Sequence, residues 1–472
     1  MHDTAELVSP KSHGFWETVK ESLRGSQQDY TRGSIARAIM LLAVPMVLEM
    51  VLESVFAVTD VFFVGKLGAN AIATVGLTES LLTVLYALAM GLSIGVTAMV
   101  ARRIGEKDVD GARDAAVQGV LAGLIIATVL GVTGVILAPR LLGMMGASPE
   151  VVLTGSNFTR VMLGGDVSVL LLFLVNAIFR GAGDAAIAMR VLWLANAINI
   201  VLGPLLIFGV GPFPRLGVTG AAIATTIGRG TGAVFALSRL MRGKGRISIV
   251  PANIRVHLRV MKELVTLSAA GTLQMIIGMA SWIGLVRIIS TYGSQALAGY
   301  TIGVRLIIFA MLPSWGMSNA AATMVGQALG AKDPVRAESA VWRAVVYNTL
   351  FLTVVGLVFL FATAPIVGFF TRDPAVAGYA YDCLHTVSYG FILYASGMVL
   401  TSAFNGAGDT WTPTVLNLII FWLFEIPLAY FLAQTMHMGP HGVFLAITVA
   451  FCAMAVVSAL VFRLGRWKQQ KV

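Results

Sequence analysis

Charged residues are scarce in this sequence. Asp, Glu, Lys and Arg make up 12% of its 472 residues, whereas hydrophobic residues make up 57% and the mean hydropathy is +0.84. Soluble domains usually carry about 25% charged residues, so this composition excludes that class. It indicates a polytopic membrane protein.

Cysteines and nucleotide-binding motifs are also rare or missing. The two cysteines, Cys383 and Cys452, fall in separate apolar segments, which argues against a disulfide or a metal site. The sequence has no G-x-x-x-x-G-K-[ST] loop for ATP phosphates. His437 and His441 have metal-like spacing, but no carboxylate or cysteine lies near them in the sequence. We find no nucleophile with a partnered base, and we therefore expect the protein not to be an enzyme.

Long apolar segments recur along the chain. A helix of about 20 residues crosses a hydrocarbon core of about 30 Å and satisfies its own backbone hydrogen bonds in lipid. The segments do not alternate with a period of two, so we expect an all-α protein with about twelve transmembrane helices. The predicted helices cover residues 35–64, 70–100, 114–138, 156–180, 187–210, 217–240, 263–291, 296–328, 339–369, 379–405, 412–434 and 440–462.

Lysine and arginine gather on alternate loops between these helices. They are frequent before residue 38, in 102–113, in 239–262, in 332–343 and after residue 462, whereas the opposite loops hold Lys66, Arg140, Arg215 and Arg372. Because short cytoplasmic loops carry such an excess, we expect both termini to be cytoplasmic and the helices to cross the plasma (inner) membrane. The net charge of +10 reflects this bias toward acidic lipids, and no nucleic-acid partner is expected.

The chain repeats itself with an offset of 225 residues. "KLGANAIATVGL" from Lys66 aligns with "TYGSQALAGYTI" from Thr291, "MVARRIGEKD" from Met99 with "MVGQALGAKD" from Met324, and "FRGAGD" from Phe179 with "FNGAGD" from Phe404. An even number of helices in each copy leaves both copies in the same orientation. Two pseudo-symmetric six-helix lobes are therefore expected to face each other across a central cavity.

The repeat divides the chain into five regions. Residues 1–34 form a cytoplasmic N-terminal segment, 35–241 the N-lobe with helices 1–6, and 242–262 a basic cytoplasmic linker. Residues 263–463 form the C-lobe with helices 7–12, and 464–472 a cytoplasmic tail. Within the first region, "GFWETVKESLRG" has apolar residues at helical spacing, which fits either a short helix on the inner membrane surface or a frayed leader.

Three acidic residues interrupt the first apolar segment. On a helix, Glu49, Glu53 and Asp60 fall within about 40° of one another. A charged carboxylate at membrane depth costs about 2.5 to 3.5 kcal/mol, so this stripe is expected to face the lobe interior or a watery cavity. Glu79, in the second helix, returns to about the depth of Glu53. Protons and cations would compete for such a cluster, although Glu49 or Glu79 could instead accept hydrogen bonds that hold helices together.

Several motifs together resemble the multidrug and toxic compound extrusion (MATE) family. They are Pro45 early in the first helix, "TDVFFVGKLG" at its end, "RRIGEKD" after the second helix, "RGAGD" after the fourth and "NIVLGPLLIFG" in the fifth. The resemblance extends over essentially the whole chain. It implies a twelve-helix, two-lobed secondary antiporter that expels organic, often cationic, compounds in exchange for protons or sodium ions.

The resemblance also assigns individual residues. Asp60 matches the acid that the family places at the end of helix 1, and Asn199 matches its polar partner in helix 5. In the DinF-type branch an Asp often precedes the next proline, but this sequence has Gly203 there. Glu53 and Glu79 are therefore the candidates to replace the missing carboxylate. The NorM-type branch keeps acids in helices 7 and 10, and since helix 7 and the centre of helix 10 hold none here, we expect coupling in the first lobe.

Two further acids lie inside predicted helices. Asp166 either joins the N-lobe cluster or pairs with Arg160. Glu425 lies beside Pro427, where a bend could present it to a cationic substrate, and pairing with Arg287 or Arg305 is the alternative.

Other side chains are weaker candidates. Met275, Met279, Trp282 and Phe309 are either cavity walls for flat cations or ordinary packing. Asp184 and Asp409, which end the paired "GAGD" turns, are expected to cap helices.

We therefore expect a monomeric antiporter that exports organic, cationic amphipathic compounds in exchange for H⁺ or Na⁺ by alternating access. Apart from that coupling ion we expect no cofactor, metal site or catalytic residue, and the partners are small organic cations and the lipid bilayer. The candidate binding and coupling residues are Asp60, Glu53, Glu49, Glu79, Asn199, Asp166 and Glu425. The alternative is a flippase or exporter of lipid-linked saccharides of the same two-lobed superfamily, whose cavity should hold several Arg or Lys for pyrophosphate, whereas the cluster here is acidic.

Overall fold

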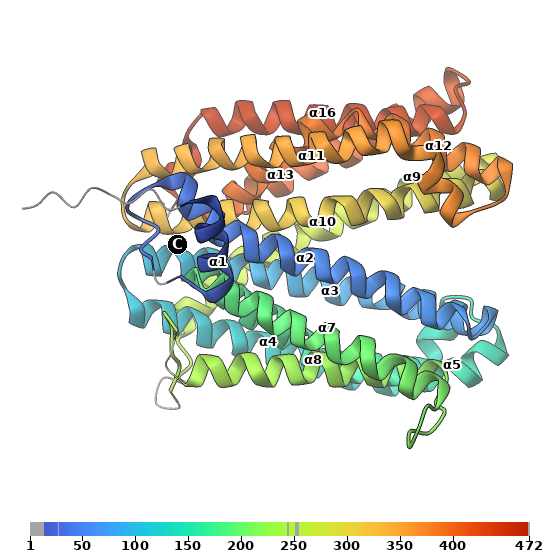
Figure 1. The fold of residues 1–472 in the computed structure, drawn as a ribbon, viewed down its shortest axis with the longest axis horizontal. Helices are drawn as coiled ribbons and strands as arrows, with labels where there is room; N and C mark the ends of the chain where they lie inside the picture. Colours follow the sequence, from blue (N-terminus) through green and yellow to red (C-terminus); the bar gives the residue numbers. More distant parts are fainter. Residues whose placement is uncertain (1–13, 27, 243–244, 251–253, 471–472) are drawn as a thin grey trace, which may run out of the picture.

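The computed structural model of the protein describes residues 14–26, 28–242, 245–250 and 254–470. These residues form α-helices and a few 3-10 and π-helical segments, and no strand is present among them. Figure 1 shows the long helices running side by side in two bundles, one built from the first half of the chain and one from the second. The prediction of an all-α protein with two helical lobes is confirmed.

The first half of the chain forms the N-lobe, preceded by a short helix. The predicted fourth helix is divided at Gly165 into two helices, a break that was not predicted from the sequence. The described helices are α1 (Phe15–Arg24), α2 (Ile35–Gly65), α3 (Ala69–Gly105), α4 (Val109–Met144), α5 (Pro149–Gly164), α6 (Asp166–Ala182), α7 (Ala185–Phe208) and α8 (Val218–Met241).

The C-lobe is less regular than the N-lobe. Its elements are α9 (Leu258–Ile289), η2 (Ser290–Tyr292), α10 (Ser294–Gly330), α11 (Pro334–Phe370), α12 (Pro374–Ser388), α13 (Phe391–Gly406), α14 (Trp411–Asn417), η3 (Leu418–Glu425), α15 (Ile426–Tyr430), η4 (Phe431–Thr435), α16 (Pro440–Arg463) and η5 (Arg466–Gln469). The predicted tenth helix is divided into α12 and α13, which are bent by 62°. The predicted eleventh helix alternates between α and π geometry, with η3 and η4 π-helical. Pro427 has no N–H to continue an α-helical ladder, which accounts for the wider turns beside it.

Most of these helices have the length and composition of membrane spans. Among the described residues, ten helices are long and apolar enough to cross a membrane, and the bent pair makes eleven when taken as one span. α8 is not among them, because Thr225, Thr226 and Arg229 make it more polar. Several helices run beyond their predicted ends. α3, for example, continues to Gly105 rather than residue 100, since its last turn carries charged residues that hydropathy does not assign to a span.

The predicted repeat is visible in the backbone. α3 and α10 are both 37 residues long, and both of their ends are shifted by 225 residues, from Ala69 to Ser294 and from Gly105 to Gly330. Each helix is preceded by a glycine with a positive φ, 95° at Gly68 and 99° at Gly293. These angles favour glycine, which has no Cβ to clash.

The turn that follows each of these helices is also duplicated. Lys107 has a φ of 63° and Lys332 a φ of 60°, so both lysines adopt the left-handed conformation. The next residue caps the following helix in each copy: Asp108 accepts the Gly111 N–H and Asp333 accepts the Arg336 N–H, both at 2.9 Å. The shared "KD" dipeptide therefore builds the same helix-to-helix turn in both lobes.

The lobes meet along α2 and α3 on one side and α9 and α10 on the other. α1 and the C-terminus lie at one end of the bundle, called here the terminal end, and α5 and α12 lie at the other, the distal end (Figure 1). At the terminal end, Gly105 packs on the backbone of Gln327, and Gly330 packs on the backbone of Arg102. A Cβ at either glycine would overlap main-chain atoms, so the two lobes are in close contact there.

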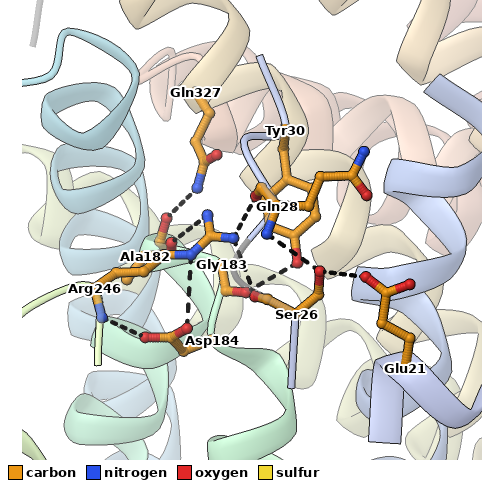
Figure 2. A network of polar contacts seen from close by, with 10 residues as sticks. Glu21, Ser26, Gln28, Tyr30, Ala182, Gly183, Asp184, Arg246 and Gln327 are labelled. Carbon is orange, nitrogen blue, oxygen red and sulfur yellow. Dashed lines mark hydrogen bonds and ion pairs between the residues drawn. The ribbon is translucent and has the colours of Figure 1, made fainter. Parts of the chain in front are cut away.

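A strap, residues 28–33, lies over this contact. Figure 2 shows the linker residue Arg246 between the strap and the turn after α6. Its guanidinium donates to the Gln28 carbonyl and lies 4.5 Å from the ring centre of Tyr30. The Tyr30 hydroxyl donates to the Gly183 carbonyl at 3.3 Å. Burial raises the pKa of Tyr30 to about 12, so its phenol remains a donor at physiological pH.

The C-lobe holds the same strap from the other side. The Arg336 guanidinium of α11 donates to the carbonyls of Tyr30 at 3.0 Å, Arg32 at 3.0 Å and Gly33 at 2.9 Å. Lys107 in the N-lobe adds an ion pair to Asp29 at 2.6 Å. The strap is thus bound to both lobes at once.

The two "GAGD" aspartates differ in what they bind. Asp409 accepts the Thr412 N–H at 3.2 Å and its hydroxyl at 2.7 Å, as expected of a helix cap. The Asp184 side chain makes no capping bond to α7, so that prediction is wrong. It accepts the backbone N–H of Arg246 at 2.9 Å instead (Figure 2). Burial raises the pKa of Asp184, while the N–H and guanidinium of Arg246 oppose this rise.

Candidate functional site

A cavity of about 480 Å³ lies between the lobes. Its N-lobe wall comes from α2, α3 and α8, and its C-lobe wall from α9 and α10. On α3 and α10 its lining residues precede the glycines that close the terminal end, so the cavity lies toward the distal end. The charged and aromatic residues that line it are Glu53, Asp60, Glu79, Arg229, Arg305, Phe56, Tyr86, Trp282, Tyr300 and Phe309. A chamber of this size can enclose a small organic molecule.

A second cavity of about 70 Å³ continues from the first into the N-lobe. It is large enough to hold water. Thr78 and Thr225 add hydroxyl groups to its wall. The residues that line both cavities are Phe56, Asp60, Glu79, Tyr86 and Arg229.

Glu53 lies in the wall of the larger cavity with both carboxylate oxygens bound. Oε1 accepts a hydrogen bond from the Arg229 guanidinium at 3.0 Å, and Oε2 accepts one from the Asn196 amide at 2.9 Å. Arg229 is 4% exposed and also lies 5.7 Å from the ring centre of Phe56. The Glu53 carboxylate is therefore bound by one side chain of α7 and one side chain of α8.

Asp60 and Glu79 differ from Glu53 in having free carboxylates. Among the described residues, neither side chain has a hydrogen-bond or ion-pair partner. Asp60 is half-buried and Glu79 is exposed, and both line the two cavities. The sequence placed Glu79 at about the depth of Glu53; in the structure Glu79 lines the larger cavity together with Glu53 and Asp60, and the smaller cavity together with Asp60.

Glu49 lies in the interior of the protein and not in either cavity wall. It is 1% exposed and accepts a hydrogen bond from the Arg180 guanidinium at 2.9 Å. Arg180 stands in the last turn of α6, in the "RGAGD" motif, and its carbonyl accepts the Thr323 hydroxyl of α10 at 3.1 Å. The stripe of three acids on α2 thus divides into one buried ion pair and two cavity residues.

Asn199 hydrogen-bonds a threonine and not one of the carboxylates in the described chain. Its amide donates to the Thr225 hydroxyl at 2.8 Å, and Thr225 lines the smaller cavity. The asparagine that contacts a carboxylate is Asn196, about one helical turn earlier on α7. The neighbouring Gly203 leaves space around it, since a Cβ there would meet Asn199 Oδ1 at 3.8 Å and no other atom within 4 Å.

Asp166 is the first residue of α6, directly after the break at Gly165. It is 1% exposed, and neither of its oxygens has a hydrogen-bond partner in the described chain. The predicted pairing with Arg160 is wrong for this structure, because that guanidinium donates to Asn157 at 3.4 Å. Asp166 lines neither cavity.

Glu425 ends the π-helical segment η3 and is 3% exposed. It lines neither cavity, and no ion pair joins it to Arg287 or Arg305 within the described residues. Arg305 instead faces the larger cavity from α10. Glu425 is thus a buried C-lobe acid, and the expected exposure at a bend beside Pro427 is wrong for this conformation.

The predicted aromatic walls are present in part. Trp282 and Phe309 line the larger cavity from the C-lobe side, opposite the carboxylates of α2 and α3. Met275 and Met279 are not among its described lining residues.

The sequence did not predict which basic side chains accompany the acids. Arg180 binds Glu49 outside the two cavities, Arg229 binds Glu53 in the cavity wall, and Arg305 lines the larger cavity and does not pair with Glu425 in the described chain. A signal for Arg229 exists, because an arginine inside the apolar segment 217–240 is as costly in lipid as a carboxylate. The partners themselves could not be read from the sequence, since they stand on helices far apart in the chain.

The sequence was compared with known proteins and solved structures. It matches the MatE family over residues 45–205 and 270–431. It is 24% identical to the "Probable multidrug resistance protein NorM" of Thermotoga maritima over 447 residues, which cover 93% of this chain and 94% of that protein. It is 25% identical to the "FAD transporter" of Shewanella oneidensis, covering 84% of this chain and 87% of that protein.

The fold is also similar to solved structures. A structure described as the outward-facing conformation of a multidrug resistance MATE family transporter of the MOP superfamily matches with a TM-score of 0.87. The two sequences are 26% identical, and the match covers 93% of this chain and 98% of that chain.

Proposed function

Because this chain belongs to the MatE family of multidrug efflux transporters, which are not enzymes, we propose that it is a secondary antiporter that exports organic, cationic amphipathic compounds in exchange for H⁺ or Na⁺. One observation carries the proposal: Asp60 and Glu79, whose carboxylates have no hydrogen-bond or ion-pair partner in the part of the chain that the structure describes, line a cavity between the lobes. A cation can bind to them, and a proton or metal cation can displace it.

The charges of the cavity favour a cationic cargo. Three carboxylates and two guanidinium groups line it, so its formal charge is negative when all are ionised. Arg229 is bound to Glu53, which leaves the carboxylates of Asp60 and Glu79 against the single guanidinium of Arg305. The aromatic rings of Trp282 and Phe309 on the opposite wall suit a flat organic cation.

The orientation rests on the distribution of basic residues. We assign the terminal end, with its Lys- and Arg-rich loops, to the cytoplasm, and the distal end to the outside of the plasma membrane. In that orientation the close contact of the lobes seals the cytoplasmic side, and the cavity faces outward. Both ends of the chain are then cytoplasmic, and the protein acts as a monomer.

The proposed cycle follows from this arrangement. When the terminal end opens, Asp60 and Glu79 bind the organic cation from the cytoplasm. The lobes then close at the terminal end, and the entering H⁺ or Na⁺ displaces the cargo to the outside. Alternating access requires that the glycine contacts of α3 and α10 separate in each cycle.

A flippase for lipid-linked saccharides is less well supported. Pyrophosphate would need several free basic groups, and of the two arginines in the cavity Arg229 is already bound to Glu53. The name of the Shewanella oneidensis relative indicates a different cargo, a flavin dinucleotide, for that protein.

The test uses purified protein in liposomes loaded with ethidium. A pH gradient and a sodium gradient are applied separately, each directed against the movement of the dye. Wild-type protein should move dye under at least one gradient, and Asp60→Asn and Glu79→Gln should each lower the rate about tenfold or more, which corresponds to about 1.4 kcal/mol.

The matched control is Glu150→Gln. Glu150 is an exposed acid in the first turn of α5, away from both cavities, and its loss should leave the rate unchanged. Undiminished efflux in both cavity variants would remove Asp60 and Glu79 from the proposed site. Transport of a lipid-linked saccharide but not of ethidium would favour the flippase.

A further inference from the structure

Arg229 is an unusual residue for the interior of a transmembrane lobe. It stands in the middle of α8, is 4% exposed and lines both cavities. Its Nη2 donates to Glu53 at 3.0 Å, while Nε and Nη1 have no partner among the described residues. A guanidinium cannot lose its proton in a protein, so this positive charge is permanent.

The binding of Glu53 sets it apart from the other cavity acids. Both of its oxygens are bound, one by Arg229 and the other by the Asn196 amide. An incoming cation would have to displace a guanidinium that is covalently attached to α8 and cannot diffuse away. Asp60 and Glu79 line the same cavity, and among the described residues no guanidinium is hydrogen-bonded to either of them, although Arg229 and Arg305 line that cavity too.

We infer that Arg229 is a tethered counter-cation for Glu53, so that the transported cation and its coupling ion exchange on Asp60 and Glu79 and not on Glu53. This inference rests on the proposed function. It makes Arg229 a residue that sets where a cation can bind. Glu53 then serves to neutralise Arg229, and the two charges together have no net effect on the cargo.

Paired substitutions test this role. Glu53→Gln leaves an unbalanced positive charge that repels the cargo, and Arg229→Gln leaves a free carboxylate that retains it. We expect each single variant to lower ethidium efflux about tenfold, and the double variant to recover to within about threefold of wild type, because coupled residues are not additive. Arg229→Lys keeps the charge and should stay closer to wild type than Arg229→Gln.

An inactive double variant would contradict the inference. If Glu53 itself exchanged cations, the double variant would be as inactive as Glu53→Gln alone, and the inference would be overturned. Thermal unfolding in detergent identifies variants that have lost their fold, and these do not enter the comparison.

A second measurement needs no variant at all. Dicyclohexylcarbodiimide modifies protonated carboxyl groups in apolar surroundings, and mass spectrometry locates the modified residue. In the wild-type protein we expect modification of Asp60 or Glu79, slowed by ethidium, and none of Glu53. Modification of Glu53 as fast as that of Asp60 would overturn the inference.

The two proposals fail in different ways. Absence of efflux by the wild type under either gradient contradicts the proposed antiport. Full efflux in both Asp60→Asn and Glu79→Gln leaves antiport standing and contradicts the placement of cation exchange on these two residues. The carbodiimide pattern does not depend on transport, so it tests the role of Arg229 even then.

Discussion

The buried pair of Glu49 and Arg180 joins α2 to α6 inside the N-lobe. Their side chains are 2% and 12% exposed, and the ion pair measures 2.9 Å. Removing one partner of a buried pair leaves an uncompensated charge in the interior. We therefore expect both residues to have a structural role, although Glu49 stands on the same stripe as Glu53 and Asp60.

Glu49→Gln should destabilise the protein strongly. We expect a loss of about 3 to 5 kcal/mol, because Arg180 would remain buried without its carboxylate. The measurement is thermal unfolding in detergent. Glu79→Gln is the matched control, since Glu79 is exposed and has no described partner, and it should change the midpoint little. Equal midpoints for Glu49→Gln and wild type would contradict the structural role.

The sequence predicted that one face of α2 is turned toward the lobe interior or a cavity, but not how its acids divide between the two. Helical spacing places Glu49, Glu53 and Asp60 on one stripe, and two of them do line the cavity. Their partners are set by tertiary packing: Arg180 is 131 residues from Glu49, and Arg229 is 176 residues from Glu53. The periodicity of α7 also could not show which asparagine binds a carboxylate, because Asn196 and Asn199 lie about one turn apart on the same helix.

Among the elements, the strap has the clearest consequence for conformational change. It contacts the linker and the turn after α6 in the N-lobe, and α11 in the C-lobe. Any movement that separates the lobes at the terminal end must break the bonds to one of them. The strap therefore stabilises the arrangement in which that end is closed.

Arg336→Ala should loosen the strap. The substitution removes hydrogen bonds to the carbonyls of Tyr30, Arg32 and Gly33, each of which contributes about 0.5 to 1.5 kcal/mol in typical proteins. We expect amide hydrogen exchange in residues 28–33 to become about tenfold faster. Arg343→Ala, an exposed arginine further along α11, is the control. Unchanged exchange in Arg336→Ala would show that the strap is held by other contacts.

The repeat was predictable because its signals are local. The "KD" turn needs a lysine in the left-handed conformation followed by a capping aspartate, and both copies carry that pair at Lys107 and Lys332. The breaks in the predicted helices were not predictable. The division at Gly165 and the π-helical turns before Pro427 lie within segments long enough for one span each, and although a bend was expected at Pro427, neither the division nor the π geometry was predicted.

For the molecule as a whole, the close contact of α3 and α10 decides which end is open. A Cβ at Gly330 would overlap the Arg102 carbonyl and approach the Gly105 Cα, and these backbone atoms cannot rotate away. The closed terminal end therefore depends on glycine at this position.

Gly330→Ala should shift the lobes apart at the terminal end. Spin labels can be attached at Val109 of α4 and Val335 of α11, which are both exposed. Double electron–electron resonance should then measure a longer distance between the two labels than in the protein with Gly330, and ethidium efflux should fall. Gly378→Ala is the control, because a Cβ there meets no atom within 4 Å. An unchanged distance in Gly330→Ala would mean that the helices can slide past the added methyl group.

The contacts that hold the two lobes together are unevenly distributed along the interface. The terminal end is held by the strap and by backbone packing, while the distal side of the interface is occupied by a hollow chamber. An empty molecule should consequently rest with the chamber open on the distal side. For the proposed antiporter, the slow part of each turnover should then be the return to the cytoplasm without cargo. Supply of the driving ion, rather than abundance of the drug, would then set how quickly a loaded cell is cleared.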